Sequence, residues 1–154
     1  MKLKVEGIAQ EEVLRFRHRG LDANGQSPLI RRSEGGRNPC RHCLGLIAEG
    51  SEMLVLCYRP FASIQPYAES GPIFLHAASC DRYASDRLPD WFASLDPALV
   101  RGYGADDWIC YETARVVRGA ELTAACESIL DNPEVAYVHV RSKYNCFQCR
   151  VDRA

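Results

Sequence analysis

The sequence has no long hydrophobic run, and nothing in it approaches the roughly 18 consecutive apolar residues of a transmembrane helix. Residues 1–6 also lack the apolar core and the small-residue cleavage site of a secretory signal. We therefore predict no membrane association and a cytoplasmic location. A strong net charge is absent too, because 19 basic residues stand against 20 acidic ones. The resulting charge of −1 argues against broad attraction to nucleic acid or anionic lipid.

The signature motifs of common enzyme classes are missing as well. We find no phosphate-binding loop, no serine or cysteine nucleophile motif and no paired-carboxylate pattern. The sequence therefore indicates no particular reaction or substrate. Internal repeats, low-complexity segments and long linkers are also absent, and 154 residues fall within the usual size of one domain, about 100–200 residues. We predict a single domain over residues 1–154.

The order of predicted elements indicates the fold class. Only residues 120–131 have a long helical pattern, with one apolar stripe formed by Leu122, Ala125, Cys126, Ile129 and Leu130. Shorter helical segments are predicted at residues 11–18 and 89–95. Strands are predicted at residues 3–8, 29–32, 53–58, 73–76, 108–117, 135–141 and 146–151. This pattern predicts an α+β fold with a mainly antiparallel β-sheet, one well-defined helix at about 120–131 and one or two short helices.

Two of these strands have distinctive patterns. Residues 53–58 are an unbroken apolar run, which predicts a central strand buried on both faces. Residues 135–141 alternate instead, so that one face suits a core and the other a polar or functional surface. The core face would carry Ala136, Val138 and Val140, and the other face Tyr137, His139 and Arg141.

Cysteine is abundant, with eight residues in the chain. In a reducing compartment, paired cysteines indicate metal or redox chemistry rather than a disulfide framework. Two Cys-x-x-Cys pairs are present: Cys40 with Cys43, and Cys146 with Cys149. Four thiolates can hold one tetrahedral zinc ion, so we predict a structural zinc site from these four residues. Cys57, Cys110 and Cys126 lie among apolar neighbours and are expected in the core.

The metal prediction has open alternatives. The first pair resembles a zinc knuckle, because Gly45 follows it closely and lets backbone amides approach sulfur. However, the second pair begins about a hundred residues later, whereas about 15–20 residues usually separate such pairs. His76 and Cys80 are therefore alternative ligands, and unliganded thiols or an occasional disulfide are a further reading. Neither pair precedes a helix of the kind that thioredoxin-like chemistry requires.

An enzyme is the first alternative function. His139 and Arg141 share a strand face, and His76 and Tyr67 would complete a pocket if their segments lie nearby. Histidine would then act as a general acid or base, and arginine would hold an anion. In the competing interpretation, His139 and Arg141 lie on the surface of a half-exposed sheet. The sequence favours the second interpretation, because no catalytic motif accompanies these residues.

A nucleic-acid-binding module is the second alternative. Basic and aromatic side chains interleave near the end of the chain, as they do on surfaces that bind single strands. The residues concerned are Arg141, Lys143, Tyr144, Phe147 and Arg150. The stretch is short and the chain as a whole is not basic, which disfavours this interpretation. The sequence identifies no partner and leaves a homo-oligomer open.

Four segments of the chain resemble a known family. They are residues 39–41 (PCR), 67–74 (YAESGPIF), 137–140 (YVHV) and 145–153 (NCFQCRVDR). Together they resemble a small bacterial family, the domain of unknown function 1203, nearly from end to end. The family has no settled activity, so the resemblance implies no reaction. It does imply that Cys40 and Cys146 are spatial neighbours. Many members carry only the first cysteine of each pair, which places this chain in a cysteine-richer branch.

Overall fold

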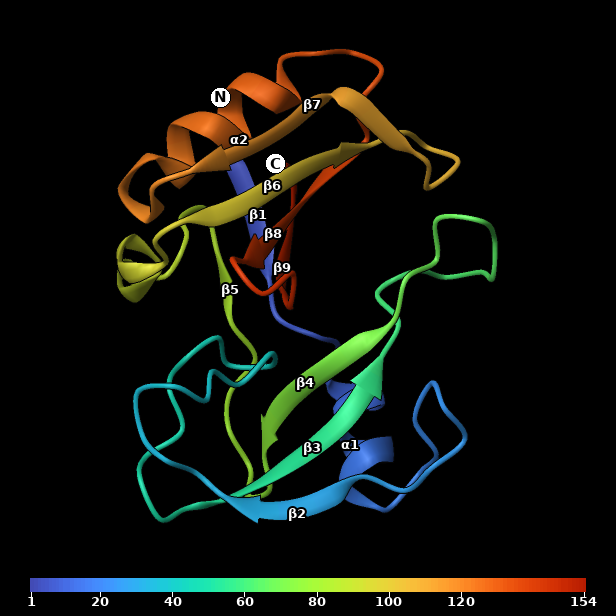
Figure 1. The fold of residues 1–154 in the computed structure, drawn as a ribbon, viewed down its shortest axis with the longest axis vertical. Helices are drawn as coiled ribbons and strands as arrows, with labels where there is room; N and C mark the ends of the chain where they lie inside the picture. The colour runs from blue at the N-terminus through green and yellow to red at the C-terminus, as the bar shows by residue number, and fades with distance from the viewer. The chain divides into compact units, whose positions relative to one another are not determined.

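The computed structural model describes all of residues 1–154, which form two compact units (Figure 1). One unit, here called the six-stranded unit, contains Met1–Glu6, Phe61–Ala68 and Ala84–Ala154. The other, the three-stranded unit, contains Gly7–Pro60 and Glu69–Tyr83. The prediction of a single domain stays a prediction.

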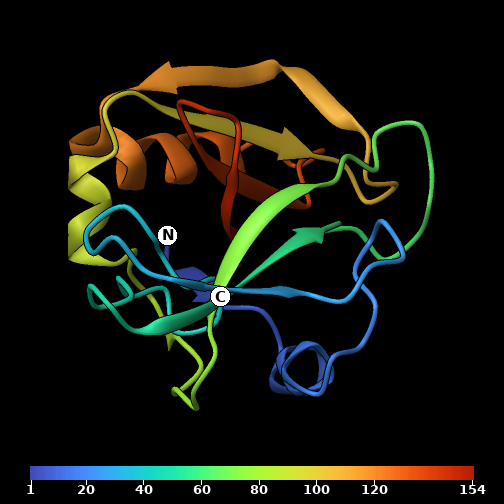
Figure 2. The ribbon, with the colours of Figure 1, turned by 60° about the horizontal axis from the view of Figure 1, so that its bottom comes forward.

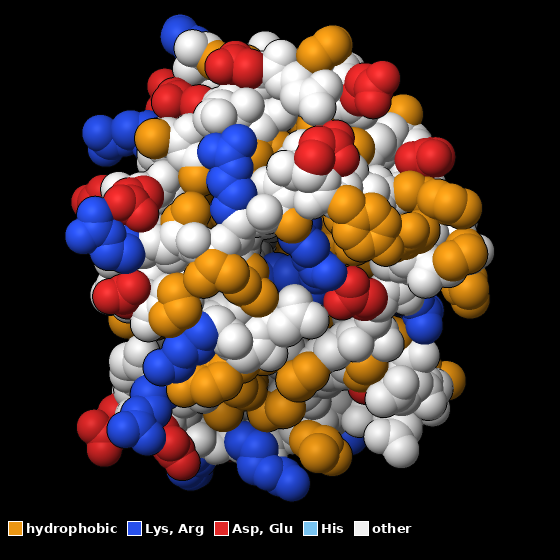
Figure 3. Space-filling view, turned by 45° about the horizontal axis from the view of Figure 1, so that its top comes forward, with side chains coloured by type: hydrophobic (Ala, Val, Ile, Leu, Met, Phe, Trp, Pro, Cys, Tyr) orange, Lys and Arg blue, Asp and Glu red, His pale blue; other side chains and the backbone are white.

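None of the helices has both the length and the apolar character needed to cross a bilayer. On the face seen in Figure 3, basic and acidic side chains are interspersed rather than gathered into one large field of a single sign. This dispersal fits the net charge of −1.

An antiparallel sheet with the order β5-β1-β9-β8-β6-β7 forms the centre of the six-stranded unit (Figure 1). Its strands are β1 (Leu3–Glu6), β5 (Ala84–Ser85), β6 (Ala98–Tyr103), β7 (Ile109–Val117), β8 (Tyr137–Ser142) and β9 (Phe147–Arg153). Two 3₁₀ turns, η1 (Asp90–Ser94) and η2 (Gly119–Glu121), and the helix α2 (Leu122–Leu130) complete the unit. Together with the other unit, this confirms the predicted α+β class with mainly antiparallel sheets.

Helix α2 packs against one face of this sheet. Its buried residues are the predicted apolar stripe, Leu122, Ala125, Cys126, Ile129 and Leu130. Gly102 of β6 lies against Ile129 of the helix. A Cβ at Gly102 would lie 2.7 Å from Thr113 Oγ1 and 2.9 Å from Ile129 Cγ2, so a side chain there would force the layers apart. Glycine at this position therefore permits the close packing of helix and sheet.

The opposite face of β8 carries Tyr137, His139 and Arg141, as the alternation predicted. The strand pairing places Arg101 of β6 and Arg150 of β9 directly beside His139, one on each side. This face is not an open polar surface, because all of β8 is buried and His139 is 0 % exposed. Aromatic side chains cover this face of the strand. The expectation of a half-exposed sheet at His139 is therefore wrong.

The three-stranded unit contains the antiparallel sheet β2-β3-β4 and helix α1 (Gln10–Arg17), which lies along one side of the sheet (Figure 2). The strands are β2 (Leu29–Arg32), β3 (Glu52–Tyr58) and β4 (Gly71–His76). Strand β3 is central, as predicted, although only Met53, Leu54 and Leu56 are fully buried. These side chains form one core with Val13 and Phe16 of the helix.

Sequence analysis missed two strands, the two-residue β5 and the longer β6. The apolar start of β6 is short, and Gly102 and Arg101 interrupt the hydrophobic pattern from which strands are predicted. In the structure both interruptions have a reason. Gly102 makes room for α2, and Arg101 lies on the face that carries His139. Strand β6 is thus specified by its neighbours in the sheet more than by its own sequence.

Candidate metal centre

Four potential ligands of a metal ion lie together in the three-stranded unit: Cys40, Cys43, His76 and Cys80. Their ligand atoms are all within 4.8 Å of one another. The sulfurs of Cys40 and Cys80 are 4.0 Å apart, and Cys43 Sγ is 3.5 Å from His76 Nδ1. Two sulfurs on one tetrahedral zinc ion are about 3.8 Å apart when each Zn–S bond is about 2.3 Å. The spacing in the cluster is therefore close to that of a complete shell.

Residues 39–46 form the loop that carries the first cysteine pair, here called the knuckle loop. The backbone N–H of Cys40 donates to the carbonyl oxygen of Gly45 at 2.8 Å, which closes the turn. Leu44 has a φ of 53°, in the left-handed region, so the chain reverses directly after Cys43. A turn this tight directs two side chains spaced three residues apart toward the same point. The knuckle that the sequence predicted is therefore formed.

The other two ligands come from β4 and the segment after it. Cys40 forms an isolated parallel bridge with Phe74 of β4, and the N–H of Arg41 donates to the Phe74 carbonyl oxygen at 3.0 Å. This pairing attaches the knuckle loop to the edge of the strand. His76, the last residue of β4, is thereby placed beside the loop, and Cys80 follows four residues later. The edge of the sheet thus brings together residues that are far apart in the chain.

Hydrogen bonds to sulfur favour a thiolate in the first cysteine pair. The Cys43 thiol contributes most to lowering the pKa of Cys40, and the backbone N–H groups of Cys43, His76 and His42 add to the effect. The same thiol–thiol contact raises the pKa of Cys43, although the N–H of Gly45 opposes that shift. One thiolate is therefore favoured at Cys40 before any metal arrives. Thiolates are the metal-binding form of cysteine.

Arg17 supplies a positive charge beside the cluster. Its Nη2 donates to Cys80 Sγ at 3.3 Å, and its Nε donates to the His76 carbonyl oxygen at 3.1 Å. The residue lies in the last turn of α1, one turn after Val13, which is buried in the core together with Phe16. Three thiolates on a divalent ion leave a net negative charge, which a guanidinium at this distance would offset. Sequence analysis missed this residue, because the local pattern of the helix does not indicate which segment its side chain contacts.

Gly7 lets the chain pass directly against the knuckle loop. A Cβ at this position would lie 1.8 Å from the carbonyl oxygen of His42. The neighbouring backbone is tied to the loop, since the N–H of Ile8 donates to the Arg41 oxygen at 2.8 Å. The N–H of Tyr83 donates to the His42 oxygen at 2.9 Å. Two backbone segments, at residues 7–8 and at Tyr83, therefore support the knuckle loop. Only glycine at position 7 leaves room for the first of them.

The second cysteine pair belongs to the six-stranded unit. Cys149 is buried in β9 opposite Val140, and Cys146 lies in the turn before that strand. Neither is part of the cluster that the structure gathers. The four-cysteine set therefore stays a prediction, whereas the alternative ligands His76 and Cys80 lie beside the first pair. Of the three cysteines expected in the core, Cys126 is buried, and Cys57 and Cys110 are half-buried.

The chain matches the family described as a protein of unknown function (DUF1203) over residues 37–153. The chain belongs to this family. The match covers more than three quarters of the sequence and confirms the resemblance inferred from its motifs. No curated protein and no solved structure matches the chain. All four residues of the cluster lie within the DUF1203 match, whereas Gly7 and Arg17 precede it.

The second constellation in this DUF1203 chain surrounds His139. Four aromatic rings have their centroids 4.7–5.2 Å from the His139 ring, and they belong to Phe61, Tyr103, Tyr137 and Phe147. Arg141 Nη2 is 3.4 Å from His139 Nδ1, so these two predicted pocket residues are neighbours. Burial lowers the pKa of His139 well below its usual range, and the nearby arginines add to the effect. His139 is therefore held neutral.

The other two pocket candidates are elsewhere. His76 belongs to the metal cluster, and Tyr67 contacts Trp108 and Tyr111. Among the residues predicted to bind nucleic acid, Arg141 is 4 % and Phe147 is 8 % exposed, so neither side chain is accessible to a single-stranded nucleic acid. Lys143, Tyr144 and Arg150 are exposed. Catalysis at His139 and nucleic-acid binding both stay predictions.

Neutral His139 leads to a prediction about acid stability. The unfolded chain protonates this histidine near its ordinary pKa of about 6.5, whereas the folded chain does not. The unfolded state therefore binds more protons below that pH, and stability is lost as the pH falls. We expect His139→Phe, which keeps a ring of similar size, to remove about 2 kcal/mol of the stability change between pH 7 and pH 5.

Urea unfolding of both proteins across this pH range measures the effect. The metal cluster is shared by the two proteins, so its own acid sensitivity cancels in the comparison. Parallel curves of unfolding free energy against pH for the wild type and His139→Phe would contradict the buried neutral histidine.

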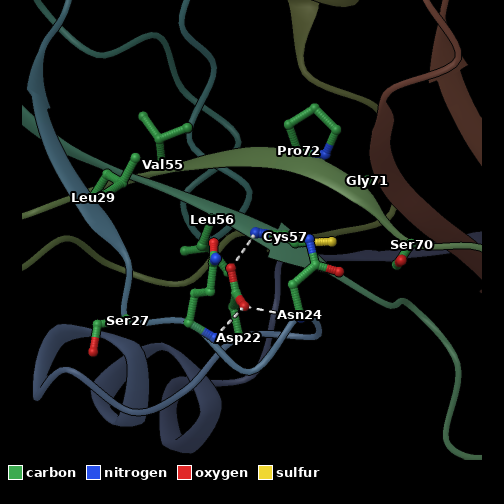
Figure 4. A pocket seen from close by; sticks show the side chains of 11 residues that line it. Asp22, Asn24, Ser27, Leu29, Val55, Leu56, Cys57, Ser70, Gly71 and Pro72 are labelled. Atoms are coloured by element: carbon green, nitrogen blue, oxygen red, sulfur yellow. Dashed lines mark hydrogen bonds between the residues drawn. The ribbon is translucent and has the colours of Figure 1, made fainter.

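A pocket of about 440 Å³ lies in the three-stranded unit, between β3, the start of β4 and the turn around Asp22 (Figure 4). The Asp22 carboxylate points toward it but is fully engaged. Its Oδ1 accepts the N–H groups of Asn24 and Gln26, and its Oδ2 accepts the N–H of Cys57 at 2.9 Å. These bonds lower the pKa of Asp22 despite the opposing effect of desolvation. Asp22 therefore fixes the turn, and the pocket offers no comparable group to a ligand.

Proposed function

We propose that this DUF1203 protein binds one zinc ion through Cys40, Cys43, His76 and Cys80. The observation that carries the proposal is the convergence of three sulfurs and one imidazole within 4.8 Å. Three thiolates and a histidine are one of the usual ligand sets of structural zinc. Soft sulfur donors in a tetrahedral arrangement favour zinc over magnesium or calcium, which prefer oxygen ligands. A reducing cytoplasm, the location that the sequence predicts, would keep the thiols available.

The role we propose for the ion is structural. Four protein ligands fill a tetrahedral shell and leave no position for water or a substrate, unlike catalytic sites with three protein ligands. The ion would join the knuckle loop to the end of β4 and to the segment at Cys80. These ligands are separated by up to 40 residues in the chain, so binding would restrict a large part of the three-stranded unit. Metal affinity would then contribute directly to folding.

Two features outside the ligand set support the proposal. Backbone N–H groups directed at the sulfur of Cys40 stabilise the thiolate that zinc requires. Arg17 contacts the sulfur of Cys80 and the backbone of His76, so it both offsets charge and orients a ligand. Outer groups of this kind commonly change metal affinity about 10–100-fold. Their presence favours a metal site over a chance gathering of cysteines.

Zinc titration in competition with a chromophoric chelator tests this function and the role of Arg17. We expect the wild-type protein to bind one equivalent of zinc and Arg17→Ala to bind it about 10–100-fold more weakly. Arg15→Ala is the matched control, because Arg15 lies on the same helix but its guanidinium contacts the Leu21 carbonyl oxygen instead. Wild-type protein that takes up no zinc would overturn the proposed function. Equal affinities of Arg17→Ala and wild type would overturn only the role of the arginine.

A further inference from the structure

Three aromatic side chains gather on the surface of the six-stranded unit, and we call them the aromatic surface: Tyr67, Trp108 and Tyr111. The centroid of the Tyr67 ring is 4.9 Å from that of Trp108 and 6.0 Å from that of Tyr111. The Tyr111 hydroxyl donates to the Tyr67 hydroxyl at 3.1 Å. The rings are nevertheless open to solvent, with Trp108 47 % and Tyr111 67 % exposed.

Single exposed aromatic side chains are common on protein surfaces, but several that gather into one exposed patch commonly mark a binding site. Trp and Tyr are enriched among the residues that dominate binding energy at protein interfaces. Here Tyr67 comes from the loop 61–68, Trp108 from the turn between β6 and β7, and Tyr111 from the start of β7, and ring contacts and the hydroxyl bond hold them together. Ile64, from the same loop, is 84 % exposed. The surface is therefore partly preformed, which lowers the entropic cost of binding.

Acidic side chains border these rings, and we call them the acidic border: Asp106, Glu112 and Glu134. All three are exposed and none forms an ion pair. Asp106 Oδ1 accepts the backbone N–H of Trp108 at 3.1 Å, so its carboxylate is held next to the indole. Desolvation contributes most to raising the pKa of Cys110, and the charges of Glu112, Glu134 and Asp106 add to it. The three carboxylates therefore act on the same short segment, since Cys110 lies between Trp108 and Tyr111 in the chain.

The turn between β6 and β7 lies on the right in Figure 1. On the right side of Figure 3, hydrophobic side chains gather and acidic side chains lie near them.

The charge of the border decides which kind of partner fits. Aromatic rings attract cations through their faces, and carboxylates beside them strengthen the attraction. The same carboxylates would repel the phosphates of a nucleic acid, although stacked rings alone would suit its bases. We propose that the aromatic surface and its acidic border are a docking site for a lysine- or arginine-rich segment of a partner protein. The site is independent of the metal cluster, which lies in the other unit.

Fluorescence anisotropy with a labelled peptide of alternating arginine and serine tests the proposal at low ionic strength. We expect saturable binding that added salt weakens, and no binding of the matching glutamate–serine peptide or of oligothymidine. Trp108→Ala should weaken binding about tenfold. Asp106→Asn keeps an oxygen for the Trp108 N–H but removes the charge, and should weaken binding of the basic peptide too. Circular dichroism checks that each variant is folded.

Tyr144→Ala is the matched control, because Tyr144 is 76 % exposed in the same unit but lies beside Lys143 rather than acidic side chains. It should bind the peptide as the wild type does. Absence of peptide binding by folded wild-type protein would overturn the proposal, as would equal binding by folded Trp108→Ala. Preference for oligothymidine over the basic peptide would also overturn it and indicate a nucleic-acid surface instead.

Discussion

Replacing Cys80 with serine is expected to remove zinc from the protein, whereas replacing Cys146 with serine should leave the zinc content unchanged. Cys80 is one of the four clustered ligands, and its sulfur is 4.0 Å from that of Cys40. Cys146 lies in the six-stranded unit, in the turn before β9. The two variants therefore separate the ligand set that the structure gathers from the four-cysteine set that the sequence predicted. Serine is nearly the same size as cysteine but is a poor zinc ligand.

Melting temperature provides the second measurement on these variants. Loss of a structural zinc removes stability from the three-stranded unit, so Cys80→Ser should melt about 10 °C lower, since each kcal/mol shifts the midpoint by about 2–4 °C at this size. Cys146→Ser should melt within a few degrees of the wild type. The reverse result, with zinc lost only in Cys146→Ser, would establish the four-cysteine set. Full zinc content in both variants would exclude either residue as a necessary ligand.

Replacing Gly7 with alanine is expected to destabilise the protein by about 3 kcal/mol or more, because overpacking against backbone cannot be relieved by turning a side chain. The added methyl group would lie 1.8 Å from the carbonyl oxygen of His42, far inside any normal contact. The knuckle loop must then move away, which pulls Cys40 and Cys43 from His76. We expect weaker zinc binding together with the lower stability.

Gly36→Ala is the control for this substitution. A Cβ at Gly36 would meet nothing within 4 Å, and the residue lies in the same unit shortly before the knuckle loop. Its unfolding free energy, measured by denaturant titration, should stay within about 0.5 kcal/mol of the wild type, as for most surface substitutions. Equal stabilities of Gly7→Ala and wild type would show that the loop does not rest on Gly7 as described.

Local patterns in the sequence predicted much of the fold. The stripe on residues 120–131 identified α2 because a surface helix must place its apolar side chains on one face. The alternation in residues 135–141 assigned the two faces of β8 correctly. It did not predict that Tyr137, His139 and Arg141 would be buried, because their cover comes from Phe61 and other side chains distant in the chain. The alternation of residues shows which side chains share a face of one strand, but it does not show which other segments cover that face.

At the candidate metal centre, too, the local geometry could be predicted from the sequence and the contacts between distant segments could not. The spacing of Cys40 and Cys43 and the nearby Gly45 predicted the knuckle, since all of its geometry is local. The remaining ligands depend on which strand edge lies beside the loop, and no local pattern carries that information. His76 and Cys80 were named only as alternatives for this reason. No local pattern indicates the role of Gly7, because that role depends on a close approach between segments about 35 residues apart.

The central claim is that the chain holds one zinc ion in the Cys40, Cys43, His76 and Cys80 cluster. Elemental analysis of untagged protein, purified without added metal, tests it most directly. We predict about one zinc per chain in the wild type and less than a tenth of that in Cys80→Ser. Wild-type protein that is free of zinc as purified, and whose melting temperature does not change in strong chelator, would contradict the claim.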